Sequence, residues 1–156
     1  MAIPFFSIDL TGSDIYAYLK SVVSRNVDLL ESKKVMHEQL ASRFPNHKVT
    51  ILPSARLAFY LLLKCSFKPG DEIIFPVLGF PLYVKIALKL GLVPVLVDVE
   101  PDNLTIDPET ITASISNNTK AIVVTHLFGH PARLGELLQI ANERKIPLIE
   151  DAAQSF

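Results

Sequence analysis

The chain has 156 residues, of which 49% are hydrophobic, so one domain of ordinary size with its own core is expected. Its 15 Lys and Arg nearly balance its 16 Asp and Glu without any polybasic or polyacidic block, which argues against nucleic acid or an anionic membrane as the main partner. Neither a secretory signal nor an uncharged apolar run of about 20 residues is visible, so we expect a soluble, cytoplasmic protein with no membrane partner. The single cysteine, Cys65, lies in an apolar stretch and is expected to pack inside the protein.

The amino-terminal part is predicted to be helical. Thr11 or Ser13 can cap its start, and apolar residues recur at helical spacing through about Phe44, where a second helical stretch ends before Pro45. The apolar residues that share one face of the first stretch are Ile15, Tyr18, Leu19, Val22 and Val23. We therefore expect an amino-terminal helical segment over 1–47.

After residue 47 the pattern changes to short apolar strands that alternate with helices. Ser54 can cap the first of these helices, Gly91 can end the second in a left-handed conformation, and Asp107 with Pro108 can start the third. Strands are predicted over 48–52, 72–75, 93–97, 120–125 and 146–149, and helices over 54–66, 80–90, 108–115 and 132–144.

This alternation predicts an α/β fold over 48–156, with three α/β/α layers around a mostly parallel sheet. The predicted strands are almost wholly apolar instead of alternating with polar residues, as in sheets that helices cover on both faces. The carboxyl ends of parallel strands meet at one edge of the sheet, where such folds hold their ligands. Three features of the sequence fall at such strand ends.

The first feature is the turn into the helix after 48–52, with Ser54, Ala55 and Arg56. A helix start offers unpaired backbone donors and the positive end of the helix dipole, which suits a phosphate group. Ser54 adds a hydroxyl and Arg56 a charged fork for phosphate oxygens. The alternative is that Ser54 is only a helix cap and that Arg56 is only a solvated residue of the first turn.

The second feature is Gly79 with Phe80, after the strand predicted over 72–75. The ring of Phe80 could lie over a flat cofactor, and Gly79 would permit a close approach. Aromatic rings also simply fill protein cores, so both interpretations stay open.

The third feature is Asp151 with Gln154, after the strand predicted over 146–149. Burying a carboxylate at a strand end costs several kcal/mol unless a cation or donor pairs with it. A protonated ring nitrogen is such a partner, as in pyridoxal phosphate (PLP) enzymes, and Gln154 could reach a polar substituent of the same ring. A structural cap or ion pair is the alternative role for Asp151.

Metal and dinucleotide sites are disfavoured. His126 and His130 are four residues apart, but Gly129 and Pro131 interrupt any regular helix across them and no third ligand is near. The glycine fingerprint of dinucleotide-binding folds and the Walker phosphate loop are both missing from the sequence. We therefore expect no metal site.

Several segments match a known family in order and approximate spacing. The stretch from about residue 53 to the end resembles the amino-terminal half of the DegT/DnrJ/StrS sugar aminotransferases, which are PLP enzymes of the aspartate aminotransferase fold (fold type I). The segments that carry the resemblance are Pro69-Gly70-Asp71-Glu72-Ile73-Ile74-Phe75-Pro76, Leu90-Gly91-Leu92-Val93-Pro94-Val95, Val97-Asp98-Val99, Asp107-Pro108-Glu109, Thr119-Lys120-Ala121-Ile122, His126-Leu127-Phe128-Gly129-His130-Pro131 and Glu150-Asp151-Ala152-Ala153-Gln154.

The resemblance implies a site for pyridoxal 5'-phosphate. Asp151 would pair with the pyridine nitrogen, Gln154 would lie beside the ring hydroxyl, and Phe80 would stack on the ring. Ser54 and Ala55, followed by Arg56, stand where the family usually has a Gly-Thr pair at the phosphate. The implied reaction moves an amino group from glutamate to a nucleotide-linked keto-sugar, although some members dehydrate deoxysugars, and the implied assembly is a homodimer.

In this family the Schiff-base lysine lies beyond the Asp-Ala-Ala-Gln motif, a position that neither Lys120 nor Lys145 occupies. We therefore expect a fragment, an incomplete PLP-binding large domain that is inactive alone and contains no catalytic residue. The strand over 48–52 would then be short of neighbours in the sheet. Two alternatives remain: a non-catalytic PLP-fold remnant acting as a binding or regulatory module, and an unrelated nucleotide-binding domain.

Overall fold

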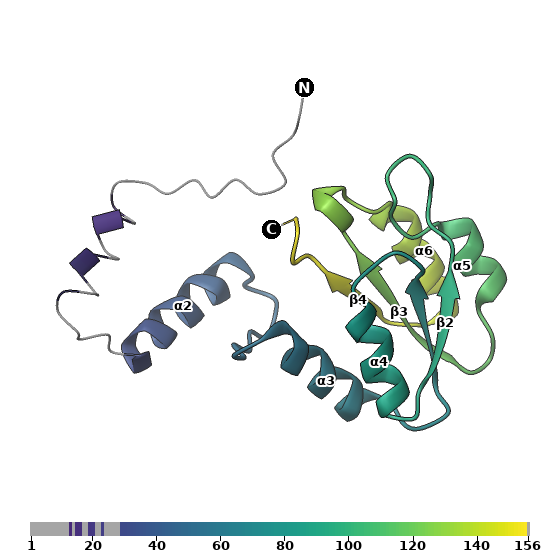
Figure 1. Ribbon diagram of the computed structural model, residues 1–156, viewed down its shortest axis with the longest axis horizontal. Coiled ribbons are helices and arrows are strands. Elements are labelled where there is room, and N and C mark those ends of the chain that lie inside the picture. The colour runs from purple at the N-terminus through teal and green to yellow at the C-terminus, as the bar shows by residue number, and fades with distance from the viewer. Residues whose placement is uncertain (1–12, 14, 17–18, 21–22, 24–28, 156) are drawn as a thin grey trace. The chain divides into compact units, whose positions relative to one another are not determined.

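The computed structural model describes residues 13, 15–16, 19–20, 23 and 29–155 (Figure 1). The chain divides into two compact units, Met1–Pro53 and Ser54–Phe156. Among the described residues, no helix combines the length and the apolar character that crossing a bilayer requires.

In the first unit, α2 (Leu29–Arg43) ends before Pro45 as predicted, because a residue that precedes proline is biased away from the helical conformation. The ring of His37, within this helix, contacts the carbonyl of Val49, which follows the helix, at 3.2 Å. Ser13, Ile15, Leu19 and Val23 are helical and exposed, whereas the predicted positions Thr11, Tyr18 and Val22 lie outside the described residues.

The predicted strand over 48–52 is wrong, because these residues form no strand. A short β-rich sequence becomes a strand only when a neighbour pairs with its backbone, and no described segment does so here. In the part of the chain that the structure describes, the sheet therefore has four strands where five were expected.

The second unit contains that sheet, in the order β2-β1-β3-β4 with every pairing parallel. Its strands are β1 (Glu72–Pro76), β2 (Val93–Val97), β3 (Thr119–Thr125) and β4 (Leu148–Asp151). Its helices are α3 (Ala55–Ser66), α4 (Pro81–Lys89), α5 (Pro108–Ser114) and α6 (Leu134–Arg144), with a short 3-10 turn, η1, over Leu127–Gly129. The parallel α/β prediction is confirmed.

Helices cover both faces of the sheet, so the three-layer prediction also holds (Figure 1). On one face, α3 and α4 bury an apolar cluster that includes Phe59, Leu63, Tyr83, Ile86 and Ala87 over Ile73, Phe75, Ala121 and Val123. On the other, residues of α5 and α6 such as Ile111 and Leu137 pack on Ile74, Ile122 and Val124. These central strands are apolar at successive positions because each face has its own core.

Two predictions in this unit, the end of β4 and the burial of Cys65, differ from the structure. Gly91, with a φ of +74°, follows α4 as predicted, and its conformation disfavours any residue with a side chain. β4 runs two residues further than predicted, because Glu150 and Asp151 pair with Val124 and Thr125 of β3 despite being polar. Cys65, which was expected to pack inside, is exposed near the end of α3.

Candidate functional site

A pocket of about 260 Å³ lies at the carboxyl ends of three of the parallel strands. The pocket is lined by residues from four places in the fold. These are the start of α3, the loop from β1 into α4, the end of β3, and the end of β4 with the turn that follows it. Its lining residues are Ala55, Gly79, Phe80, Tyr83, Thr125, Leu127, Asp151, Ala153 and Gln154. Four of the six predicted site residues, Ala55, Phe80, Asp151 and Gln154, are therefore brought together in one place.

Asp151 is the last residue of β4 and is half-buried. Its Oδ1 accepts a hydrogen bond from the backbone N–H of Ala153 at 3.1 Å, and its carbonyl accepts from His126 N at 3.1 Å. No described Lys, Arg or His lies within ion-pair distance of its carboxylate. A half-buried carboxylate thus faces a hollow without a cationic partner.

Gln154 is fixed by the loop that follows β3. Its Oε1 accepts a hydrogen bond from the N–H of Phe128 at 2.6 Å, which leaves the side-chain NH₂ as the donor available toward the pocket. Phe128 has a φ of +56°, an uncommon conformation for a residue with a side chain, and Gly129 follows it with a φ of +81°. This loop geometry aims the N–H of Phe128 at the Gln154 amide.

His126 anchors the same loop, and its two ring nitrogens serve the protein and not a metal ion. Nδ1 accepts a hydrogen bond from the N–H of Ala132 at 3.0 Å, so the remaining proton of the neutral ring is on Nε2, which donates to Glu150 Oε1 at 2.7 Å. The side chain is only 4% exposed. Among the described residues there is no group of three side chains suited to hold a metal ion.

Phe80 forms an aromatic wall of the pocket. Phe80 is the N-cap residue of α4, and Pro81 follows it in the first turn, where the fixed φ of proline suits a helix. Phe80 is 50% exposed. Tyr83, one helical turn later, lies edge-on to Phe80 with ring centroids 5.4 Å apart, and Phe59 stacks on its other side at 4.0 Å. An exposed ring at a strand end offers a flat surface to a ligand.

Tyr83 was missed by the sequence analysis. Burial raises the pKa of its hydroxyl to about 12, and the negative charge of Asp151 with a hydrogen bond to it adds to this shift. The spacing of three residues between Phe80 and Tyr83 places both on one side of a helix, and this signal could have revealed Tyr83.

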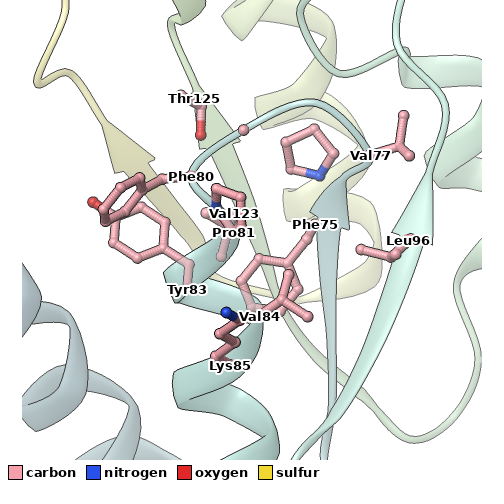
Figure 2. Close-up of a pocket in the computed structure, with 12 residues that line it drawn as sticks. Phe75, Val77, Phe80, Pro81, Tyr83, Val84, Lys85, Leu96, Val123 and Thr125 are labelled. Carbon is pink, nitrogen blue, oxygen red and sulfur yellow. The ribbon is translucent and has the colours of Figure 1, made fainter.

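Figure 2 shows the hollow on the other side of these rings, an apolar pocket of about 310 Å³. Phe80, Tyr83 and Thr125 line both pockets, so the two aromatic rings separate the polar hollow at Asp151 from an apolar one. The apolar side is bounded by residues such as Phe75, Val84 and Leu96.

Ser54 and Arg56 do not line the pocket at Asp151. Ser54 caps α3 by accepting a hydrogen bond from the N–H of Leu57 at 3.2 Å, and Arg56 is exposed in the first turn. Their neighbour Ala55 does line the pocket, so the start of α3, with its unpaired backbone donors, borders the site.

We expect Ser54→Ala to lower the free energy of unfolding by about 1 kcal/mol, because the N–H of Leu57 loses its side-chain acceptor. Urea unfolding followed by circular dichroism measures the effect. Ser66→Ala, at the exposed other end of α3, is the matched control and should change stability little. Equal destabilisation by the two variants would contradict the capping role of Ser54.

Taken together, the parallel sheet and its covering helices have the fold of PLP-dependent transferases of fold type I. Residues 22–156 match the model of the DegT/DnrJ/EryC1/StrS aminotransferase family. The chain belongs to this family.

Relatives support this placement. Over 91 residues the chain is 41% identical to the L-glutamine:2-deoxy-scyllo-inosose aminotransferase of Streptomyces lividus, a match that covers 58% of this chain and 22% of that protein. NtdA of Bacillus subtilis, solved with bound PMP, has a TM-score of 0.79 and 28% identity over 99% of this chain and 37% of its own. The GDP-4-keto-6-deoxy-D-mannose-3-dehydratase of E. coli, solved with hydrated PLP, has a TM-score of 0.79 and 26% identity over 95% of this chain and 40% of its own. The chain thus spans about a fifth of the curated relative and about two fifths of these solved structures.

Proposed function

We propose that this chain carries the coenzyme-holding part of a PLP-dependent sugar aminotransferase. The observation that supports this function best is Asp151, a half-buried carboxylate in an aromatic-walled pocket with no cationic partner among the described residues. Such a carboxylate needs a cation or donors to offset its lost hydration, and a protonated ring nitrogen is a cation of suitable size. The Asp151 carboxylate would hold that nitrogen in its protonated form.

The rest of the pocket fits a single aromatic ring. Phe80 would cover one face of that ring, and the NH₂ group of Gln154 would donate to an oxygen on it. The volume of about 260 Å³ is slightly below the range of about 300–1,000 Å³ for pockets that enclose drug-sized ligands, which suits a compact ligand.

The start of α3 would receive the phosphate group. Ala55 lines the pocket and the backbone donors of the first turn lie at this end of the helix. Ser54 uses its hydroxyl oxygen as a cap and would still donate its proton, while the exposed Arg56 would add a charged fork.

The coenzyme, when bound, supplies an electron sink that eases removal of a proton next to an amino group. The residues of this pocket would orient the ring and keep its nitrogen protonated, but they include no lysine that could move that proton. Lys120 and Lys145 line a different, polar hollow, at the start of β3 and the end of α6. We propose that the lysine is supplied by a segment that follows the Asp-Ala-Ala-Gln motif in the family.

From the family to which the chain belongs, we propose glutamate as the amino donor and a nucleotide-linked keto-sugar as the acceptor. A solved GDP-4-keto-6-deoxymannose-3-dehydratase holds a PLP-glutamate geminal diamine, and the E. coli relative is named as a dehydratase of a GDP-linked keto-sugar. The curated relative is named for L-glutamine, the amide of this donor. We further propose that the whole enzyme is a cytoplasmic homodimer.

Titration of the chain with pyridoxamine 5'-phosphate (PMP) tests this function, because this form of the coenzyme needs no lysine to bind. We expect saturable binding in calorimetry with a change in the absorption of the ring. Pyridoxamine without the phosphate should bind more weakly if the start of α3 receives the phosphate. A chain that is folded by circular dichroism but shows no saturable binding at millimolar PMP would overturn the proposal.

A further inference from the structure

Thr125 is a polar residue of the pocket to which the proposed function gives no role. It is the last residue of β3 and is 6% exposed, and it lines both the hollow at Asp151 and the apolar hollow. Its hydroxyl forms no hydrogen bond with any residue that the structure describes. Every fully buried side-chain oxygen or nitrogen in the described part of the chain has a partner, so the Thr125 hydroxyl is open to the hollow instead. A polar group that opens only into a pocket is a contact for a ligand.

The strand register places this hydroxyl beside the carboxylate of Asp151. Thr125 and Asp151 are paired neighbours in the parallel strands β3 and β4, so their side chains lie on the same face of the sheet. That face is the one covered by α3 and α4, because Val123 and Ile149, two residues earlier in each strand, pack in the cluster beneath these helices. Neighbouring strands lie about 4.8 Å apart, so one ligand atom between the two side chains can contact both.

Gly79 leaves the hydroxyl uncovered on its other side. A Cβ atom at this position would lie 3.9 Å from Thr125 Oγ1 and 3.6 Å from Cγ of Pro76, which is ordinary packing distance. Figure 2 shows Thr125 at the end of β3 with its oxygen on the side of the hollow. The space beside the hydroxyl therefore belongs to the pocket and not to another side chain.

We infer that Thr125 contacts the coenzyme: its hydroxyl oxygen is a second acceptor, beside the Asp151 carboxylate, for the protonated ring nitrogen. This contact rests on the proposed function, in which Asp151 holds that nitrogen. A hydroxyl oxygen accepts from a cationic N–H without adding charge, and hydrogen bonds from ionised donors are stronger than those between neutral groups. Valine has nearly the same shape as threonine and could not make this bond.

Thr125→Val tests the inference, because the substitution removes the hydroxyl and little else. Calorimetry should show PMP binding about fivefold more weakly, the effect of losing one hydrogen bond of about 1 kcal/mol. Nitrogen-15 NMR of PMP labelled at the ring nitrogen reads the contact directly. The shift of bound PMP should move in Thr125→Val and stay near the wild-type value in Thr125→Ser, which keeps the hydroxyl.

Thr112→Val is the matched control, since the hydroxyl of Thr112 bonds to Pro108 O within α5, away from the pocket residues. It should bind PMP like the wild type. Thr125→Ser and Thr125→Ala form a second pair that differs only in the hydroxyl, and the serine variant should bind about fivefold more tightly.

Equal affinity of the serine and alanine variants, or an unmoved nitrogen shift in Thr125→Val, would overturn the inference. Failure of the wild type to bind PMP would remove the proposed function together with this contact. Binding of PMP that does not depend on the hydroxyl would remove the contact alone.

Discussion

Asp151→Asn is expected to weaken the binding of PMP about 30-fold, the largest functional effect of any single change in the pocket. Truncating one partner of a desolvated, hydrogen-bonded charge pair costs at least about 2 kcal/mol, and each 1.4 kcal/mol is a factor of ten in affinity. Asparagine keeps the size and the Oδ1 acceptor for the N–H of Ala153, so the local turn should survive. The variant therefore removes the charge and little else. Calorimetry with PMP measures the loss.

Asp102→Asn is the matched control, because it removes the same charge from an exposed position between β2 and α5, away from the pocket residues. It should bind PMP like the wild type. If both variants bind equally well, Asp151 does not hold a ring nitrogen, and the proposed coenzyme site fails with it.

His126→Ala is expected to lower the free energy of unfolding by about 2–4 kcal/mol. The substitution removes two hydrogen bonds and leaves the N–H of Ala132 buried without its acceptor, and each such loss costs on the order of 1–3 kcal/mol. It also opens a cavity, because the ring is 4% exposed. Urea unfolding of the variant and the wild type measures the difference.

Two further variants separate the causes. His126→Asn retains an acceptor near the position of Nδ1 and should recover part of the loss, whereas His130→Ala changes an exposed side chain on the same loop and should be nearly neutral. If His126→Ala is as mild as His130→Ala, the ring does not anchor the loop that holds Gln154.

Much of the fold is encoded locally. Apolar runs predicted strands over 72–75, 93–97 and 120–125, and the structure has strands there with ends within one residue of these bounds. Ser54, Gly91 and Asp107 placed helix ends where the structure has them. These signals are reliable because caps and turns are decided by a few neighbouring residues. The strand expected over 48–52 failed for the opposite reason, since strand formation needs a partner that no local pattern specifies.

The candidate site, like the fold, was predictable from the sequence only in part. Position at the carboxyl end of a parallel strand was enough to select Phe80, Asp151 and Gln154, and the structure gathers these residues with Ala55 around one pocket. Sequence spacing did not reveal that His126 donates a hydrogen bond to Glu150, that the N–H of Phe128 donates to Gln154, or that Tyr83 lines the same pocket as Asp151. The residues of these three pairs are 24, 26 and 68 positions apart, respectively.

The sequence by itself determined the layered α/β class, the helix caps and the residue types at the strand ends, because each depends on neighbours in the chain. Only the tertiary structure decided which donors each polar side chain meets, and that Ser54 and Arg56 flank the pocket while Ala55 lines it. The physical reason is that hydrogen bonds require distances near 3 Å, and packing of the sheet and its helices sets those distances between residues far apart in sequence.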